Sequence, residues 1–266
     1  MGAMPFSLVA PGWPGIIGQG GPSYLAEAKA LFAAMTTQPT AARKTLINNT
    51  IVALKNAGIW SQLDVLYVLA AADSQAARIN WKTPGTFDAV AVNSPTFEAD
   101  RGFTGNGTSS RLRTNYTPSA NAVNLQLNNA SLWEWNRTDT QQGVNDIGNG
   151  VVPQCAICPR FTSDTTIVRV NDGTSTTVSN TSASGFFGGQ RSGASATAIW
   201  KNGVRTVTGS VSSTSLASAE QWICGANSSQ FSTHQIAGAA WAASLTGLEL
   251  QFYNIMLSYM QGVGAA

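Results

Sequence analysis

The sequence predicts a mainly β protein, in which a small helical segment precedes an antiparallel jelly-roll β-sandwich and a C-terminal helix closes the chain. Ala, Leu and Lys are frequent in residues 23–72, whereas short β-prone runs bounded by Gly, Asn, Ser and Pro follow from residue 84. Asn202-Gly203 lies between two such runs, as in two-residue hairpins that need positive φ. Apolar residues then recur at helical spacing in 246–261.

Residues 1–22 form the first of three expected segments, an extended N-terminal arm. Its Gly and Pro residues are incompatible with a regular element. Its apolar content is nevertheless too high for a solvated tail, which predicts an assembly arm that lies against a neighbouring subunit. The alternative is that the arm folds back onto its own helices or sandwich. The side chains expected to make the contact are Phe6, Trp13, Ile16 and Ile17.

Residues 23–83 are expected to form a helical lead-in. Helical spacing predicts a first helix around residues 25–35 and a second from Pro39 to Asn56, with Gly58 as the stop. A third run, 59–71, places Trp60, Leu63, Leu66, Tyr67 and Ala70 on one helical face. These helices would pack on the next domain, or alternatively form an assembly interface.

Residues 84–266 are expected to form the sandwich domain. The Asn202-Gly203 turn sets a register with Trp200 opposite Arg205 and Lys201 opposite Val204, so that Trp200 and Arg205 share a face and stack. Further strands are predicted at 130–137, 154–161, 165–171, 185–190, 221–226 and 235–243. The closing helix should present Leu248, Phe252, Ile255 and Tyr259 to the core.

Composition excludes several function classes. The net charge is +2 and 11% of residues are charged, so no basic surface for nucleic acid or an anionic membrane is expected. No run is long and apolar enough for membrane insertion, and residues 1–21 lack the pattern of a signal peptide. A polar, weakly charged surface favours an extracellular module or subunits that pack side by side.

The three cysteines do not predict a disulfide framework or a zinc site. Cys155 and Cys158 have the spacing of a redox or zinc pair, but they lie in an expected strand that turns their sulfurs to opposite faces. Zinc needs four ligands, and Cys224 and one histidine complete a set that is dispersed along the chain. We therefore expect buried, unreactive thiols.

The last third of the chain resembles the laminin-G and concanavalin A-like lectin superfamily. The resemblance rests on three features in the expected order: the hairpin 199–204, the strand 222–226 with its polar loop, and the strand 235–241 followed by Leu245-Thr-Gly-Leu-Glu-Leu-Gln-Phe-Tyr253. It implies a lectin-like sandwich whose final strand leads into a helix.

A narrower resemblance concerns proteins of tailed bacteriophages and prophages. The segment from Val92 to Ser110 looks like the entry to the sandwich in those proteins, which also carry a lead-in like Leu63 to Ala71. The resemblance implies a virion component, located in an extracellular particle as a tail fibre, a spike, or a head or tail decoration. Its partners would be other virion proteins, copies of itself and host-surface polysaccharide.

Glycan binding on a sandwich requires exposed aromatic faces beside polar groups. If 132–137 is a strand, Trp133, Trp135 and Arg137 share one face. The run 186–191, which ends in Arg191, is a second candidate. The alternative interpretation is that Trp133 and Trp135 belong to the sandwich core.

No enzyme, metal or cofactor is expected. Retaining and inverting glycosidases need two carboxylates across one cleft, and we expect that Glu98, Asp100, Glu134 and the single histidine, His234, do not converge. Asp146, Asp164 and Asp172 lie in expected loops without a clustered calcium motif. Two alternatives remain open: a carbohydrate-active hydrolase on the same fold, and a purely structural cement protein.

Overall fold

The computed structural model describes residues 23–226 and 229–266. The expected assembly arm, with Phe6, Trp13, Ile16 and Ile17, lies outside the described residues.

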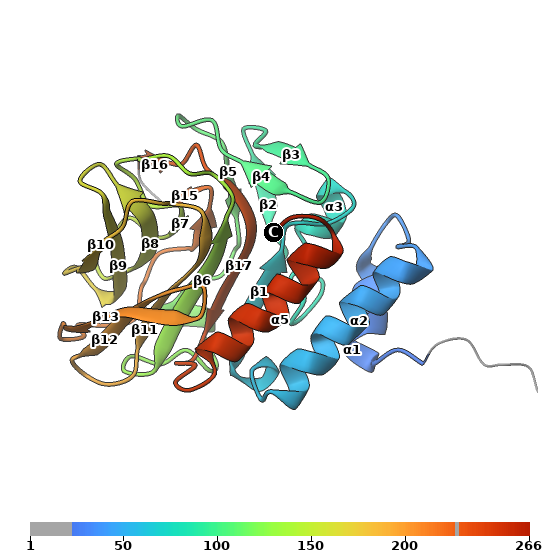
Figure 1. Ribbon diagram of the computed structural model, residues 1–266, viewed down its shortest axis with the longest axis horizontal. Helices are drawn as coiled ribbons and strands as arrows, with labels where there is room; N and C mark the ends of the chain where they lie inside the picture. Colours follow the sequence, from blue (N-terminus) through green and yellow to red (C-terminus); the bar gives the residue numbers. More distant parts are fainter. Residues whose placement is uncertain (1–22, 227–228) are drawn as a thin grey trace, which may run out of the picture.

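Two of the three expected lead-in helices are present. Helix α1 spans Ala26–Ala34 and α2 spans Ala41–Asn56. The side chain of Thr40 caps α2 by accepting a hydrogen bond from the backbone N–H of Arg43. After α2 the chain turns at Gly58, which has a φ of +73°. Both helices lie on the same side of the molecule as the C-terminal helix (Figure 1).

The prediction of a third helix at residues 59–71 is wrong. A single 3-10 turn, Trp60–Gln62, leads into strand β1, Leu63–Val68, which pairs antiparallel with the last strand, β17. Five of the six residues of β1 are buried, so the run is apolar on both faces. Such a short run fits a buried strand as well as a helix, and pairing decides between them. The helical lead-in therefore ends near Asn56, and β1 belongs to the sandwich.

Two large antiparallel sheets form the sandwich, which confirms the expected fold class. The eight-stranded sheet has the order β13-β12-β11-β6-β17-β4-β3, and β1 pairs with β17 off this path. Its other strands are β3 (Thr96–Glu98), β4 (Gly102–Thr104), β6 (Ala130–Asn136), β11 (Gly185–Arg191), β12 (Ala196–Lys201), β13 (Val204–Ser210) and β17 (Gln235–Ala242).

The seven-stranded sheet faces it with the order β10-β9-β8-β7-β14-β5-β2. Its strands are β2 (Val90–Val92), β5 (Arg111–Arg113), β7 (Ile147–Gly148), β8 (Gln154–Phe161), β9 (Thr165–Asp172), β10 (Thr176–Ser179) and β14 (Trp222–Ile223). A separate small hairpin joins β15 (Gly225–Ala226) to β16 (Gln230–Phe231). Cys224, with a φ of +63°, separates β14 from β15, so the expected strand 221–226 is broken at its centre.

The hairpin between β12 and β13 has the expected register. Trp200 pairs with Arg205 and Lys201 with Val204, while Asn202 and Gly203 have φ angles of +51° and +75°. In the described part of the chain the strands of 195–243 pair antiparallel throughout.

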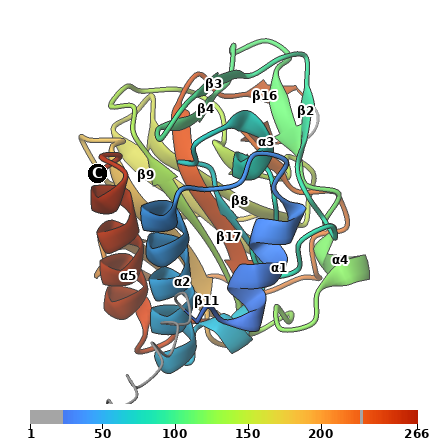
Figure 2. The same ribbon diagram turned by 90° about the vertical axis from the view of Figure 1, so that its right-hand side faces the viewer.

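Helix α5, Glu249–Gly262, closes the chain and covers part of the outer face of the eight-stranded sheet. Figure 2 shows α2 beside α5, with α1 in front of the sheet. Phe252 and Tyr259 of the expected stripe are buried, together with Met256 and Met260. Two short helices, α3 (Ser74–Ala77) and α4 (Pro118–Asn121), lie in the connections. None of the helices in the described residues has the length and apolar character needed to cross a membrane.

Candidate functional site

Helix α5 covers the part of the sheet where Trp133 and Trp135 lie. The ring of Trp133 packs edge-on against Phe252 with 5.6 Å between centroids, and Trp135 stacks on Tyr253 at 6.0 Å. Trp133 is fully buried and Trp135 is 6% exposed. A glycan needs an open ring face, so the expectation that these two residues bind glycan is wrong, and the alternative, a core role, is the correct one.

The two arginines of the expected glycan surface lie in different places: Arg191 lies in the core, whereas Arg137 lines a small hollow beside Trp135. Arg191 points between the sheets and is fully buried, where it donates from Nε to the Val170 carbonyl and from Nη1 to the Val211 carbonyl. Its expected place on a glycan surface is therefore wrong, because carbonyl groups of the core hold the guanidinium. Arg137 is half-buried and donates from Nε to Gln235 beside a small hollow near the C-terminus.

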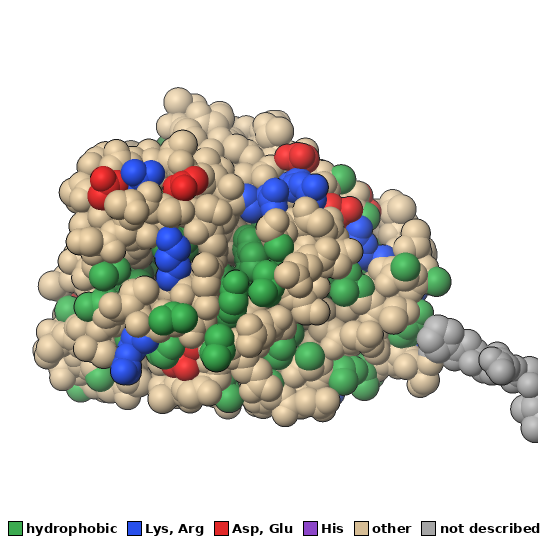
Figure 3. Space-filling model, in the orientation of Figure 1, with side chains coloured by type: hydrophobic (Ala, Val, Ile, Leu, Met, Phe, Trp, Pro, Cys, Tyr) green, Lys and Arg blue, Asp and Glu red, His purple; other side chains and the backbone are tan. Residues whose placement is uncertain are grey.

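An open groove lies next to α5, over strands β11, β12 and β13. Its volume is about 450 Å³. Strand β12 contributes Trp200, which is half-buried, and β13 contributes Arg205 and Thr208, which are exposed. Figure 3 shows this face, with hydrophobic side chains along the boundary between the sandwich and α5. The lining residues are Gln190, Ser192, Ala196, Thr197, Ala198, Trp200, Arg205, Thr208, Gly209, Thr246, Gly247 and Glu249.

Trp200 and Arg205 lie on the same sheet as Trp133 and Trp135, but they remain partly or fully exposed. The Arg205 guanidinium carbon lies 5.9 Å from the centroid of the Trp200 ring, as the hairpin register predicts. The indole Nε1 of Trp200 is buried and has no hydrogen-bond partner among the described residues. Since this N–H is shielded from the groove, Trp200 offers a ligand its ring and not its donor.

Hydrogen bonds hold the wall of the groove in place. Gln190 donates to Glu249 Oε1 at 3.0 Å and accepts from the backbone N–H of Leu245 at 3.0 Å. Glu249 Oε2 accepts from the backbone N–H of Gly247 at 2.8 Å. The start of α5 is thereby joined to strand β11, so the groove is preformed. Among the lining residues Glu249 is the carboxylate, and its oxygens already have donors.

A second cluster of polar groups lies inside the sandwich. Nδ1 of His234 is 2.8 Å from Oδ2 of Asp146, and both side chains are fully buried. Asp146 also accepts from Ser232 Oγ at 2.6 Å and from Asn136 Nδ2 at 3.0 Å. On the other side of the ring, the hydroxyl of Thr140, an exposed residue, lies 3.1 Å from His234 Nε2. Hydroxyl, imidazole and carboxylate thus follow the order of a nucleophile triad.

The protonation of His234 argues against that chemistry. Burial disfavours the charged ring, but the Asp146 carboxylate outweighs it, and the pKa of His234 is raised. Nε2 is also 3.1 Å from the carbonyl oxygen of Thr140, an acceptor that favours an N–H on Nε2. A ring that donates at Nε2 has no lone pair to take the hydroxyl proton. The arrangement is suited to fastening the Thr140 loop to β17.

The carboxylates considered for hydrolysis lie in separate surroundings. Glu98 accepts a hydrogen bond from Gln235, and Asp100 pairs with Arg43 at 2.7 Å. Glu134 is fully buried in β6, where burial and the neighbouring Asp146 raise its pKa well above its ordinary value. Glu134 and His234 lie in the sandwich interior, not on an open cleft.

The aspartates considered for calcium are also dispersed, and Asp172 is the last residue of strand β9, not a loop residue as expected. Asp164 pairs with Arg160 at 2.7 Å, and Asp172 accepts from the backbone N–H of Thr174. Within residues 23–226 and 229–266, no three His, Cys, Asp or Glu side chains are grouped so that they hold a metal ion.

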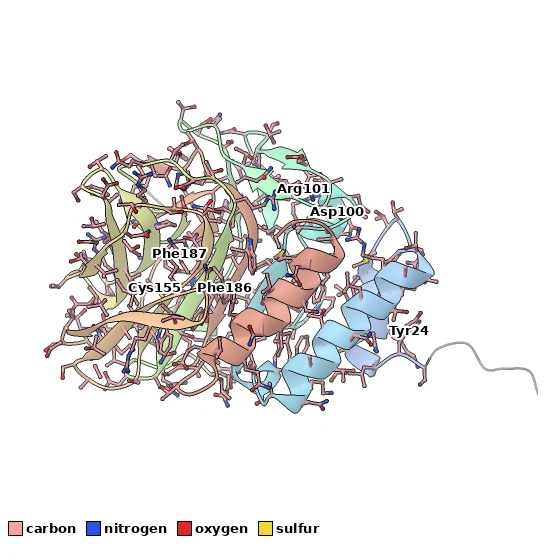
Figure 4. The ribbon with its side chains drawn as sticks, viewed as in Figure 1. Tyr24, Asp100, Arg101, Cys155, Phe186 and Phe187 are labelled. Carbon is pink, nitrogen blue, oxygen red and sulfur yellow. The ribbon has the colours of Figure 1, made fainter. Side chains whose placement is uncertain are left out.

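The three cysteines are buried and free, as expected. Burial raises the pKa of the Cys155 thiol to about 12, and also raises the pKa of Cys158 and Cys224. Figure 4 labels Cys155, which lies on β8 of the seven-stranded sheet.

These features define the class as an antiparallel β-sandwich with helical additions. No family model and no curated protein matches the chain. Among solved structures, the Trypanosoma rangeli sialidase in complex with sialic acid matches with a TM-score of 0.54 at 8% identity, over 81% of this chain and 39% of the sialidase.

A binding domain of a toxin has the same fold. The botulinum neurotoxin serotype D binding domain matches with a TM-score of 0.51 at 10% identity, over 74% of this chain and 52% of that one. The chain thus spans about two fifths of the sialidase and about half of the toxin domain. At such identities the likeness shows the fold alone.

Sequence reasoning identified the Trp200–Arg205 pair but did not recognise it as a site. The pair follows directly from the hairpin Trp-Lys-Asn-Gly-Val-Arg. The missing information was which half of the sheet α5 covers, and no local pattern supplies that.

Proposed function

We propose that the protein is a component of a phage-type virion, present in many copies, that binds host-surface glycan through the groove beside Trp200. The observation that carries the proposal is the half-buried Trp200 ring that lines a preformed groove beside Arg205.

The groove offers what a sugar ring needs. The apolar face of a hexose packs on an aromatic ring, and its hydroxyls pair with amides, hydroxyls and guanidinium groups. Trp200 supplies the ring. Arg205, Thr208 and Thr246 supply exposed polar groups along the same groove. Since the charges of Arg205 and Glu249 balance, we infer that the ligand is a neutral polysaccharide.

We propose that the protein binds glycan without cleaving it. Sialidases use a tyrosine nucleophile, and most other glycosidases use a pair of carboxylates around the scissile bond. The lining of the groove contains one, Glu249, and its oxygens accept from Gln190 and Gly247. A sialidase and a toxin binding domain share the fold, so the fold itself is compatible with either outcome. Because Gln190 and Gly247 already donate hydrogen bonds to the Glu249 oxygens, the groove favours glycan binding over hydrolysis.

The virion role rests on the resemblance of residues 92–110 to phage proteins and on the weakly charged surface, since only 11% of residues are charged. Copies of the chain and other virion proteins would be its partners. Mass spectrometry of purified parent particles, with the copy number measured against the major head protein, tests this part. Particles that lack the chain would contradict it.

A binding assay tests the groove. We expect the protein to bind a purified host-surface polysaccharide in isothermal titration, and Trp200→Ala to weaken binding by at least tenfold, about 1.4 kcal/mol. Trp222→Ala is the matched control, because Trp222 is also half-buried but lies on β14 of the other sheet. Reducing ends measured after incubation should not increase.

Each contrary result selects another function. Equal affinity of Trp200→Ala and the wild type would remove the groove from glycan binding. Release of reducing ends would favour a carbohydrate-active hydrolase. Absence of binding to every host polysaccharide, in a chain that is present in the particle, would favour a structural cement protein.

A further inference from the structure

A second cavity lies between the helical segment and the sandwich, remote in sequence from the Trp200 groove. Its volume is about 200 Å³. The loop between α1 and α2 forms one wall, and α3 with Trp81 and Tyr259 forms the other. The lining residues are Met35, Thr37, Gln38, Pro39, Thr40, Arg43, Ile47, Ala71, Ala72, Asp73, Ala76, Trp81 and Tyr259.

The walls of this cavity, the Arg43 pocket, are mainly apolar. Nη2 of Arg43 lies 2.7 Å from Asp100 Oδ1, so the guanidinium charge is balanced. Nη1 is buried and has no hydrogen-bond partner in the described part of the chain. Asp73 caps α3 through the backbone N–H groups of Gln75 and Ala76. Since Nη1 is shielded from the cavity, the pocket offers a ligand its apolar walls and suits an uncharged apolar group, as in an apolar peptide.

Such a peptide is present in this chain. Residues 1–22 contain no Asp, Glu, Lys, Arg or His, and they include Trp13, Ile16 and Ile17. A 150 Å³ apolar cavity holds a benzene-sized group, so about 200 Å³ takes one large apolar side chain.

The chain length also fits. The described chain begins next to α1, where Tyr24 packs edge-on against Phe32 with centroids 5.4 Å apart, and Figure 4 labels Tyr24 there. Met35, at the other end of α1, lines the pocket. A helix of nine residues spans roughly 14 Å. An extended chain advances about 3.3 Å per residue, so Ile16 and Ile17 can reach the pocket from Ser23.

We infer that the N-terminal arm of the same chain docks in the Arg43 pocket, with an apolar side chain of residues 13–17 inside it. A tethered segment is present at millimolar effective concentration, which favours the arm of the same chain over that of a second copy in dilute solution. The same contact would be available to a neighbour's arm only when copies are crowded.

Cysteine pairs test the docking. The native thiols are buried, so a disulfide can form only between the two added cysteines. We expect Ile16→Cys with Ala72→Cys, an exposed residue of the pocket rim, to form a disulfide within the monomer under mild oxidation. Ile16→Cys with Asn49→Cys is the control, because Asn49 is exposed on α2 and lines a different hollow. The same two pairs are made with Trp13→Cys in place of Ile16→Cys. They test whether the arm docks through an earlier residue.

The outcomes are separable on non-reducing gels. A disulfide-linked dimer would assign the pocket to the arm of a second copy and overturn the inference. Equal cross-linking to Ala72→Cys and Asn49→Cys, or no cross-linking from either arm position, would also overturn it.

A probe that needs no new cysteine gives a second measurement. Indole, titrated by calorimetry, should bind the chain lacking residues 2–20 at least tenfold more tightly than the full chain, because the deletion empties the pocket. Equal affinity for both chains would show that the arm does not occupy the pocket.

Discussion

His234 and Asp146 are 88 residues apart in the sequence, and their side chains meet at 2.8 Å in the fully buried interior of the sandwich. A buried ion pair is stabilising only when further hydrogen bonds satisfy its members. Here Ser232 and Asn136 donate to the carboxylate, and the Thr140 carbonyl accepts from the ring. The pair thus joins the loop after β6 to the start of β17.

We predict that His234→Gln lowers stability in a pH-dependent way. The pKa of His234 is raised in the folded protein above its ordinary value of 6.5. Its charge therefore stabilises the fold fully below pH 6.5, and this contribution is lost as the pH rises through the folded pKa. The loss of unfolding free energy in the variant should be largest at acid pH, about 3–5 kcal/mol, and smaller at pH 9.

Urea unfolding of both proteins at pH 5.5, 7 and 9 measures this difference. His234 is the single histidine, so no other imidazole contributes to the change. A difference that stays constant across the three pH values would exclude a charged His234 in the fold.

Glu134 gives a prediction of opposite sign. Its carboxyl group is fully buried, neither oxygen has a hydrogen-bond partner among the described residues, and its pKa is raised well above 4.5. The unfolded chain releases this proton near pH 4.5 while the folded chain keeps it, so stability is lost as pH rises above 4.5. Glu134→Gln removes that cost, and it should stabilise the protein at pH 7 by about 1–3 kcal/mol.

The stabilisation by Glu134→Gln should shrink toward zero at pH 4, where both states hold the proton. Thermal unfolding at pH 4 and pH 7 provides the comparison, and Glu98→Gln, at an exposed position, is the control with little change at either pH. A destabilised Glu134→Gln at pH 7 would mean that the carboxylate is charged and paired.

Local signals explain which parts of the fold were predictable. The Asn202-Gly203 turn has positive φ at both positions, so the sequence alone sets the partners of Trp200 and Lys201. Helix α2 was found because Pro39 near its start and Gly58 as the stop mark its ends. The run 59–71 was mistaken for a helix because it is apolar on both faces, and only β17, more than 160 residues later, makes it a strand.

The candidate site depended on long-range packing. Trp133, Trp135 and Trp200 lie on strands that have similar local patterns, and the C-terminal helix alone decides which rings are covered. The Asp146–His234 contact and the Arg43 pocket likewise join segments distant in the sequence. Neither periodicity nor motif spacing contains that information.

The buried thiols should be inert in the folded protein. The pKa of Cys155 is raised to about 12, and burial raises those of Cys158 and Cys224 as well, so thiolate is scarce at pH 8. A chromogenic disulfide reagent should label no thiol in the native protein within minutes and three thiols in 6 M guanidinium. Rapid labelling of one native thiol would mark a part of the sandwich that opens locally.

Gly188 should be the most sensitive glycine beneath α5. A Cβ at this position would lie 2.1–2.6 Å from three ring atoms of Trp133, and that ring is itself held between Phe186 and Phe252. Gly188→Ala must displace the ring and, with it, helix α5, so we expect a loss of about 1–3 kcal/mol, measured by urea unfolding. Gly193→Ala is the control, because its Cβ would meet its nearest neighbour, Ala196, at an ordinary 3.5 Å. Because α5 also carries one wall of the Trp200 groove, Gly188→Ala should weaken glycan binding while Gly193→Ala leaves it unchanged. Equal stabilities of the two variants would mean that the Trp133 ring is free to move, contrary to its packing.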